Sequence, residues 1–312
     1  MMSWLNKSAI PLILGCLSIL ASGQSLPYTV PSFEVGIEAD VVYGTAEGYW
    51  SHAPEDAWDL LREVLHQPRL PHPVGLKMDI YLPEGDDSPT RPLLLMMHGG
   101  GFFIGNKNEP GQTEWCRYFA SLGYVAASID YRMGYRLKKG ALSLAERLAE
   151  EDAADALGFL LDREDLRIDR SRIFVAGTSA GAALALSLAF QWAPDRPDCT
   201  ICAVGNFWGY VHDLSVLENA RTPILSFQSE KDPIVPYQEG YLPGGRHFSE
   251  KVYGTLAISR KAAALGIRCE HLPCPEKRHR LHLDKKKQFT PRFYEIRERM
   301  AVFFAEAMQS DG

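Results

Sequence analysis

Residues 172–190, RIFVAGTSAGAALALSLAF, place a serine between two apolar stretches of different character. The run RIFVA is typical of a buried strand, and AALALSLAF is typical of a helix. Between them, residues 177–181 read Gly-Thr-Ser-Ala-Gly, the G-x-S-x-G spacing of a nucleophile elbow. Only small side chains fit beside the serine in so sharp a turn, which exposes the serine oxygen at the positive end of a helix. The pattern predicts that Ser179 is a nucleophile.

A second glycine-rich stretch, MHGGGFFIG at residues 97–105, directly follows the apolar run PLLLM. Three consecutive glycines are costly to order, so a bare backbone here indicates that another group approaches it closely. Acyl transfer develops negative charge on a carbonyl oxygen, and backbone N–H groups held ready stabilise that charge. We predict an oxyanion hole formed by the N–H groups of Gly100, Gly101 and Ala180, with His98 supporting the loop through a hydrogen bond.

Apolar runs alternate with helical patterns along most of the chain. Strands that are apolar throughout, each followed by a helix, indicate a mainly parallel sheet with helices on both faces. Because there is no internal repeat or Pro/Ser-rich linker, we expect residues 24–312 to form a single α/β domain. The part up to Gln67 shows only short strand-like pieces, and the long segment between Pro236 and Glu250 is expected at a lid or rim. The expected strands are 76–85, 91–98, 124–132, 171–177, 202–209, 222–228 and 267–274, and the expected helices are 113–123, 142–162, 179–192, 251–266 and 291–308.

Together, the stretches HGGGF (98–102) and GTSAG (177–181) resemble the α/β-hydrolase superfamily, and within it the esterase/lipase branch with an HGGG loop. The similarity extends from about Leu76 to His282, and Ala182 departs from the further glycine that many relatives carry there. The resemblance implies the α/β-hydrolase fold and a serine carboxylic-ester hydrolase that needs no metal or organic cofactor. Three further stretches carry it: SIDYR (128–132), EEDAADALGFL (150–160) and IDRSRIFVAGTSAGA (168–182).

The superfamily's chain order, serine then acid then histidine, narrows the partners of Ser179. Asp232 lies in the loop after ILSFQ, where DPIVP resembles the superfamily's acid loop, and Asp213 is the alternative acid. The loop PEKRHRLHLD offers His279, which we favour as the base, and His282 as the alternative base. In the implied acyl transfer, His279 takes the Ser179 proton and Asp232 orients the imidazole.

The N-terminus has the pattern of a secretory signal peptide. Lys7 precedes an apolar stretch from Ala9 to Leu20, and small residues follow up to Gly23. The stretch is short for a membrane span, so we predict that residues 1–23 are cleaved and that the protein is exported, periplasmic or secreted. Lipid attachment at Cys16 is disfavoured because apolar LSIL continues beyond it. No other segment has the pattern of a membrane helix.

Composition and cysteine usage argue against several other partners. The 312 residues are 46% hydrophobic and carry a net charge of −6, with 33 basic and 39 acidic residues mixed along the chain. This distribution disfavours nucleic acid as a partner. With Cys16 removed, an odd number of cysteines remains, and Cys269 and Cys274 could bridge across a short loop. A metal site is disfavoured because the cysteine spacing is irregular and the H-x-x-H pair lacks a carboxylate at ligand spacing.

The sequence is compatible to different degrees with three other interpretations. A dinucleotide site does not explain Ser179, and GGGFFIG is out of register with G-x-G-x-x-G. A non-catalytic binding protein on the same fold and an exported serine peptidase stay open as alternatives. Ester hydrolysis is favoured, with acylated carbohydrates or other small esters as substrates. Aromatic side chains that would suit an apolar acyl or sugar group are Phe102, Phe103, Trp208, Tyr210, Tyr237 and Tyr241.

Overall fold

A sheet of eight strands forms the centre of the protein in a computed structural model, which describes residues 26–50, 71–134, 140–191, 197–247 and 249–309. The predicted signal segment, residues 1–23 with Cys16, lies outside these ranges. The strands of the sheet are β1 (Glu34–Gly48), β2 (His72–Glu84), β3 (Arg91–Met97), β4 (Val125–Ile129), β5 (Ile168–Thr178), β6 (Ile201–Phe207), β7 (Ile224–Ser229) and β10 (Cys269–Cys274).

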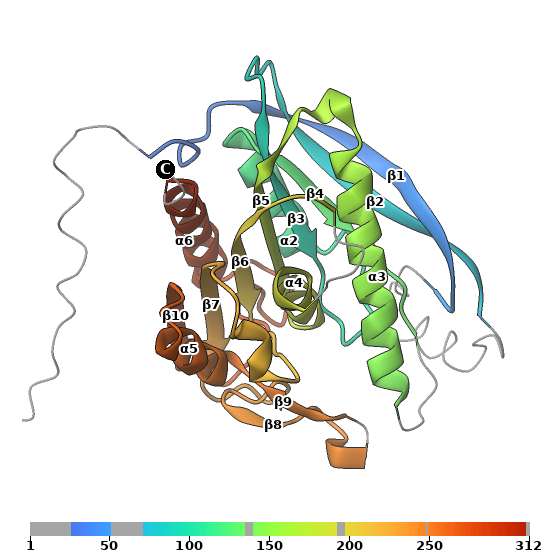
Figure 1. Ribbon diagram of the computed structural model, residues 1–312, viewed down its shortest axis with the longest axis vertical. Helices are drawn as coiled ribbons and strands as arrows, with labels where there is room; N and C mark the ends of the chain where they lie inside the picture. The colour runs from blue at the N-terminus through green and yellow to red at the C-terminus, as the bar shows by residue number, and fades with distance from the viewer. Residues whose placement is uncertain (1–25, 51–70, 135–139, 192–196, 248, 310–312) are drawn as a thin grey trace, which may run out of the picture.

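The strands lie in the order β1-β2-β4-β3-β5-β6-β7-β10 (Figure 1). β1 and β2 pair antiparallel, as do β2 and β4, and every pair from β4 across to β10 is parallel. The expected α/β class with a mainly parallel sheet is confirmed. Parallel strands end at a common edge of the sheet, so the loops that follow β3, β5, β7 and β10 meet there.

Helices cover both faces of this sheet. They are α2 (Pro110–Ser121), α3 (Ala141–Leu161), α4 (Ala180–Phe190), α5 (Thr255–Ala264) and α6 (Pro291–Ala307). One buried cluster contains side chains of α3, α4 and α5, and a second contains side chains of α2 and α6. In Figure 1, α3 and α4 lie in front of the sheet and α2 lies behind it.

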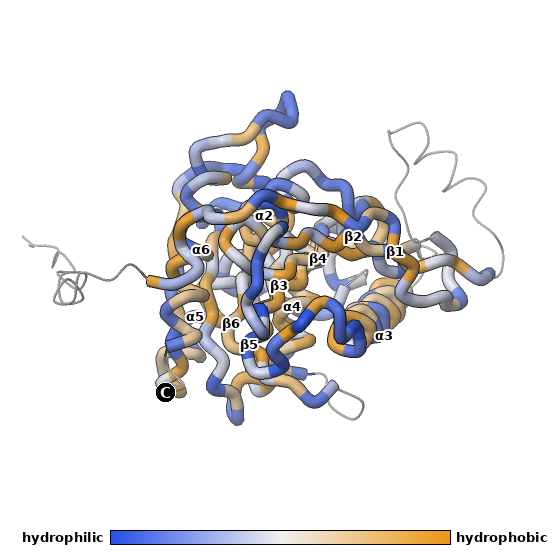
Figure 2. The backbone as a smooth tube through the Cα atoms, turned by 90° about the horizontal axis from the view of Figure 1, so that it is seen from above, coloured by the Kyte–Doolittle hydropathy of each residue, from blue (hydrophilic) through white to orange (hydrophobic). Residues whose placement is uncertain are grey.

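Strand β3 shows why the sheet is buried on both faces. Its alternate residues Leu93, Leu95 and Met97 belong to one cluster, while Leu94 and Met96 belong to the other. All five side chains are fully buried, as expected of a central parallel strand. Figure 2 shows the same contrast, with hydrophobic strands in the interior and hydrophilic loops at the periphery.

Two segments differ from the sequence-based expectation. Residues 26–50, the described part of the region up to Gln67, include the 15-residue strand β1, where the sequence predicts only short strand-like pieces. Its pairing with β2 shifts register twice, between Glu38 and Val41 and between Val42 and Gly44, and such shifts break the two-residue alternation that marks a strand. The expected helix 251–266 begins only at Thr255, because Lys251–Tyr253 form β9, which pairs antiparallel with β8 (Glu239–Tyr241).

The suggested bridge between Cys269 and Cys274 is wrong. The two residues are the first and last of β10, which is extended throughout. Five steps along a strand separate their Cα atoms by roughly 16 Å, far beyond the reach of a disulfide. No helix within the described ranges is both long and apolar enough to cross a membrane.

Candidate active site

Ser179 lies in a strained turn between β5 and α4. Its φ is 54° and its ψ is −118°, a conformation that a residue with a side chain rarely adopts. A Cβ on Gly177 would lie 2.3 Å from the Gly181 carbonyl oxygen, and one on Gly181 would lie 2.1 Å from that of Met97. Both flanking positions therefore need glycine, as the G-x-S-x-G pattern predicts.

Hydrogen bonds join the three residues proposed from the sequence as nucleophile, base and acid. His279 Nε2 lies 2.8 Å from Ser179 Oγ, and His279 Nδ1 lies 2.8 Å from Oδ2 and 3.0 Å from Oδ1 of Asp232. The Asp232 side chain is fully buried and that of His279 is 16% exposed. The three residues follow β5, β10 and β7, so the common edge of the parallel strands brings them together.

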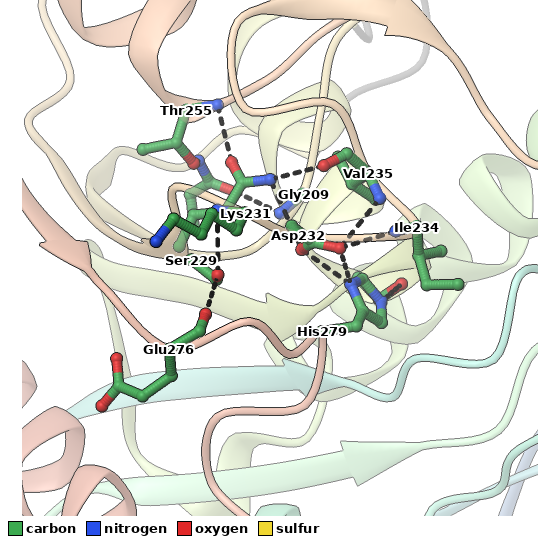
Figure 3. A network of polar contacts seen from close by, with 12 residues as sticks. Gly209, Ser229, Lys231, Asp232, Ile234, Val235, Thr255, Glu276 and His279 are labelled. Atoms are coloured by element: carbon green, nitrogen blue, oxygen red, sulfur yellow. Dashed lines mark hydrogen bonds and ion pairs between the residues drawn. The ribbon is translucent and has the colours of Figure 1, made fainter.

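The loop after β7 fixes the orientation of the Asp232 carboxylate. Oδ1 accepts hydrogen bonds from the backbone N–H groups of Ile234 and Val235, at 2.8 and 3.1 Å. Gln228 Nε2 lies 3.5 Å from Oδ2 and donates to the Val235 carbonyl at 2.9 Å. Figure 3 shows Ile234, Val235 and His279 grouped around the Asp232 carboxylate. Gln228 was not predicted as a site residue, although it is a polar residue near the end of an apolar strand and so carried a signal in the sequence.

The alternative acid lies elsewhere. Asp213 caps the short 3-10 helix Leu214–Leu217, where its carboxylate accepts from the backbone N–H and hydroxyl of Ser215. The alternative base, His282, is directed to a different carboxylate: its Nε2 lies 3.0 Å from Glu109 Oε1. Of the candidates weighed for these two roles, the structure brings Asp232 and His279 to Ser179.

The glycine loop lies directly against the elbow. A Cβ on Gly99 would lie 2.9 Å from the Thr178 carbonyl oxygen and 3.2 Å from Ser179 Cβ. Gly100 and Gly101 have φ values of +127° and +64°, and the Gly100 carbonyl accepts from the N–H groups of Phe103 and Ile104. Among the described residues, no hydrogen bond uses the N–H of Gly100, Gly101 or Ala180, the three predicted oxyanion donors.

His98 is fully buried behind this loop. Its ring stacks on that of Tyr131 with centroids 4.3 Å apart, and its Nδ1 donates to the Gly99 carbonyl at 2.7 Å. The Tyr131 hydroxyl donates to the His98 carbonyl, also at 2.7 Å. Burial disfavours the charged imidazolium and lowers the pKa of His98 to about 4. His98 therefore stays neutral at ordinary pH, in keeping with its predicted supporting role.

This lowered pKa predicts a pH-dependent loss of stability. An unfolded histidine titrates near pH 6.5, so between pH 6.5 and 4 the unfolded chain binds a proton that the folded chain does not, and the folded state weakens as the pH falls. His98→Asn keeps a donor for Gly99 and removes the titration. From pH 7 to 4.5, the unfolding free energy of the wild type should fall by about 2 kcal/mol more than that of the variant, measured by urea unfolding. Equal losses would contradict the burial argument.

The far end of the glycine loop is anchored by a buried lysine that the sequence analysis did not single out. Lys107 Nζ lies 2.7 Å from Asp79 Oδ1 and 3.1 Å from Asp40 Oδ1. Its backbone N–H donates to Asp130, and its carbonyl accepts from Ser128. These partners lie on or beside β1, β2 and β4. Because they are far from Lys107 in sequence, its anchoring role is recognised only in the folded structure.

The aromatic residues expected near the rim differ in exposure. Phe102, Trp208 and Tyr210 are buried, whereas the Tyr241 side chain is 45% exposed, and the Tyr237 hydroxyl bonds to His271. Within the part of the chain that the structure describes, no group of three or more His, Cys, Asp or Glu side chains is placed to hold a metal ion.

Comparisons with known proteins give matches to esterases and to parts of larger enzymes. Residues 78–201 match a family model described as BD-FAE. The polyketide synthase mapC' of Penicillium brevicompactum is 35% identical over 127 residues, which cover 37% of this chain and 5% of the synthase. Gut esterase 1 of Caenorhabditis elegans is 28% identical over 135 residues, covering 42% of this chain and 24% of the esterase. The chain thus spans less than a quarter of the length of these relatives.

Solved structures show the same fold over most of the chain. Esterase 2 of Thermogutta terrifontis, phosphorylated by paraoxon, has a TM-score of 0.58 and 22% identity over 75% of this chain and 89% of its own. Esterase B of Lactobacillus rhamnosis, inhibited by a tributyrin phosphonate, has a TM-score of 0.57 and 16% identity over 90% of this chain and 88% of its own.

The sheet order, the strained serine turn and these matches together define an α/β-hydrolase fold, as the sequence resemblance implied. The chain has the α/β-hydrolase fold, and its predicted resemblance to the esterases of that superfamily is confirmed.

Proposed function

We propose that the protein is a serine carboxylic-ester hydrolase that acts by two-step acyl transfer. The proposal rests on one observation, the continuous chain of hydrogen bonds from Ser179 Oγ through the His279 imidazole to Asp232. A serine hydroxyl is a weak nucleophile alone, and a histidine oriented by a carboxylate activates it. The matches to esterases support the choice of ester bonds.

In the first step, Ser179 Oγ attacks the ester carbonyl carbon while His279 Nε2 accepts the hydroxyl proton. The Asp232 carboxylate accepts a hydrogen bond from His279 Nδ1–H and stabilises the imidazolium that forms. The negative charge that develops on the carbonyl oxygen lies near the N–H groups of Gly100, Gly101 and Ala180, which would donate to it. His279 then returns its proton to the departing alcohol.

In the second step, His279 takes a proton from the water that attacks the acyl-serine, and it then gives this proton to Ser179 Oγ as the carboxylic acid leaves. We propose acylated carbohydrates or other small esters as substrates, with export directed by residues 1–23. An exported peptidase or a binding protein without activity are the outcomes that the following experiment separates from this proposal.

A fluorophosphonate probe tests the nucleophile, since such reagents phosphonylate activated serines and esterase 2 of Thermogutta terrifontis is phosphorylated by the organophosphate paraoxon. We expect the wild type to hydrolyse acetyl, butyryl, octanoyl or feruloyl esters and to be labelled at Ser179, located by peptide mass spectrometry. Labelling should abolish hydrolysis in step with the fraction of protein modified. An active protein that is not labelled at Ser179 contradicts the mechanism. Labelling at Ser179 without hydrolysis of any ester favours a peptidase, and absence of both hydrolysis and labelling favours a binding protein.

A further inference from the structure

His282, set aside as the base, is held in a tightly packed environment beside the candidate triad. Its side chain is 3% exposed, and its Nε2 lies 3.0 Å from Glu109 Oε1. Its ring stacks on the indole of Trp208, with centroids 5.2 Å apart and planes 17° apart. A Cβ on Gly111 would lie 2.3 Å from His282 Cδ2, so the start of α2 packs against the edge of the ring, and Trp115 of α2 also contacts it, with ring centroids 5.5 Å apart.

Trp208 connects this buried ring to His279. It is 1% exposed, and its ring meets the His279 ring edge to face, with centroids 6.4 Å apart and planes 70° apart. Trp208 has a φ of +51°, which is unusual and costly for so large a side chain. Its backbone N–H donates to the Phe227 carbonyl at 2.8 Å. In this strained backbone conformation at the end of β6, the indole contacts both His279 and His282.

Glu109 ties the same arrangement to the glycine loop. It precedes α2, where Oε2 accepts from the Gln112 N–H at 2.9 Å while Oε1 faces His282. Burial opposes its ionisation, but the hydrogen bond and charge from His282 outweigh this effect and hold the pKa of Glu109 below its usual value. One carboxylate therefore connects the segment that follows the glycine loop to the loop that carries His279.

The His279 loop is also fixed at its far end. The Thr290 N–H donates to the His282 carbonyl at 3.0 Å, and the Thr290 hydroxyl donates to the Leu281 carbonyl. On the acid side, the Ser229 hydroxyl donates to the Glu276 carbonyl, which joins this loop to the loop of Asp232 (Figure 3). Between these anchors, the His279 ring contacts Ser179, Asp232 and Trp208.

We propose that Trp208 and His282, with Glu109, are positioning residues that hold the His279 imidazole at its distance from Ser179. This inference rests on the proposed ester hydrolase. The triad hydrogen bonds do not fix the imidazole alone, because His279 belongs to a loop whose displacement would move the ring away from Ser179. The indole blocks that displacement on one face, and the His282–Glu109 pair holds the indole. Misplacement of a reacting group by about 1 Å can reduce the rate by about 100-fold.

The test compares variants that remove one contact at a time. His282→Gln keeps a donor for Glu109 and loses the ring stack, Trp208→Leu removes the indole, and Trp208→Phe keeps a flat ring. We expect kcat for p-nitrophenyl acetate to fall about 10- to 100-fold in His282→Gln and Trp208→Leu, with KM within about threefold of the wild type. Trp208→Phe should recover most of the loss. Each rate is divided by the concentration of active sites, which is measured from the acyl-enzyme burst or from fluorophosphonate labelling.

The pH profile separates positioning from a merely structural role. Displacing His279 from Asp232 should shift the acid limb of the kcat/KM profile toward lower pH, because the carboxylate stabilises the imidazolium. A variant that is only less stable has fewer active sites, but each keeps the wild-type profile. Glu109→Gln preserves the shape of the side chain and removes its charge, so the acid limb of its kcat/KM profile should shift less, in the same direction. This variant tests the proposal if the variants of Trp208 or His282 do not fold.

The matched control is His212→Gln. His212 Nε2 also lies 3.0 Å from a glutamate oxygen, that of Glu146, and among the described contacts it has none with Ser179, Asp232 or His279. Its kcat and pH profile should match the wild type. If His282→Gln and Trp208→Leu behave like this control, the positioning proposal is overturned while the hydrolase proposal stands. If the wild type hydrolyses no ester, or if Ser179→Ala is fully active, the hydrolase proposal fails instead. An active His279→Ala beside an inactive His282→Gln would make His282 the base and overturn the role given to it here.

Discussion

Ser179→Ala is expected to lower kcat by about five orders of magnitude or more, with the folded structure retained. The hydroxyl is the atom that would form the acyl-enzyme, and no neighbouring side chain can replace it at 2.8 Å from His279 Nε2. His279→Ala should lose nearly as much, because the serine then keeps its proton. The double variant should be no worse than either single variant, since the two groups act in one step.

Burst-free steady-state rates on the best ester of the panel, with circular dichroism to verify folding, measure this prediction. Ser187→Ala is the matched control, since Ser187 is a buried serine on the same helix, α4, and is 3% exposed. It should retain wild-type activity. The Ser179→Ala protein is purified so that contaminating esterases are excluded. If it keeps more than about 1% of the wild-type rate, Ser179 is not the nucleophile.

Gly100→Ala is expected to cause the second large loss of kcat, and the cause is backbone geometry alone. A Cβ at this position would lie 1.6 Å from the Ile104 carbonyl oxygen, and the φ of +127° is closed to alanine. The turn closed by the N–H groups of Phe103 and Ile104 on the Gly100 carbonyl would have to open. Because that turn aims the predicted oxyanion donors, kcat should fall by about 100- to 1000-fold, the loss typical of one missing donor.

Gly101→Ala is the control that separates loop collapse from simple loss of a glycine. A Cβ at Gly101 would meet nothing within 4 Å, and its φ of +64° costs alanine about 1–2 kcal/mol without a clash. The N–H remains, so kcat should stay within about tenfold of the wild type while the melting temperature falls modestly. An equal fall in kcat from the two substitutions would mean that the Gly100 turn does not orient the predicted oxyanion donors.

The elements of the fold were predictable where burial is uniform. β3, β4, β6 and β7 are buried along their whole length, as is the second half of β5, and these stretches end at recognisable turns, so their identity follows from the sequence pattern. β1 was missed because it is an edge strand with two register shifts and many exposed charges, so no regular alternation marks it. The boundary between β9 and α5 was missed because Val252 continues the helical spacing of the buried residues Thr255, Ile258 and Ala262.

The residues of the site were predictable where a local motif carries them. Ser179 and the glycine loop depend on sharp turns that only small residues allow, and such turns leave a signature within a few positions. His279 and His282 are three residues apart in one loop, and nothing local tells which reaches Ser179. The distinction lies in Glu109, which is 173 residues from His282 in sequence and 3.0 Å away in space.

His279, the proposed base, follows β10, the outermost strand at one edge of the sheet, and lies 100 residues beyond Ser179. A nascent chain therefore completes β5 and the serine turn long before the segment with His279 has been synthesised. Under the proposed mechanism, the strained serine stays inert until β10 docks beside β7 and carries the histidine loop into place. Hydrolytic activity then requires β10 to be docked, and its recovery after refolding reports the docking of this strand.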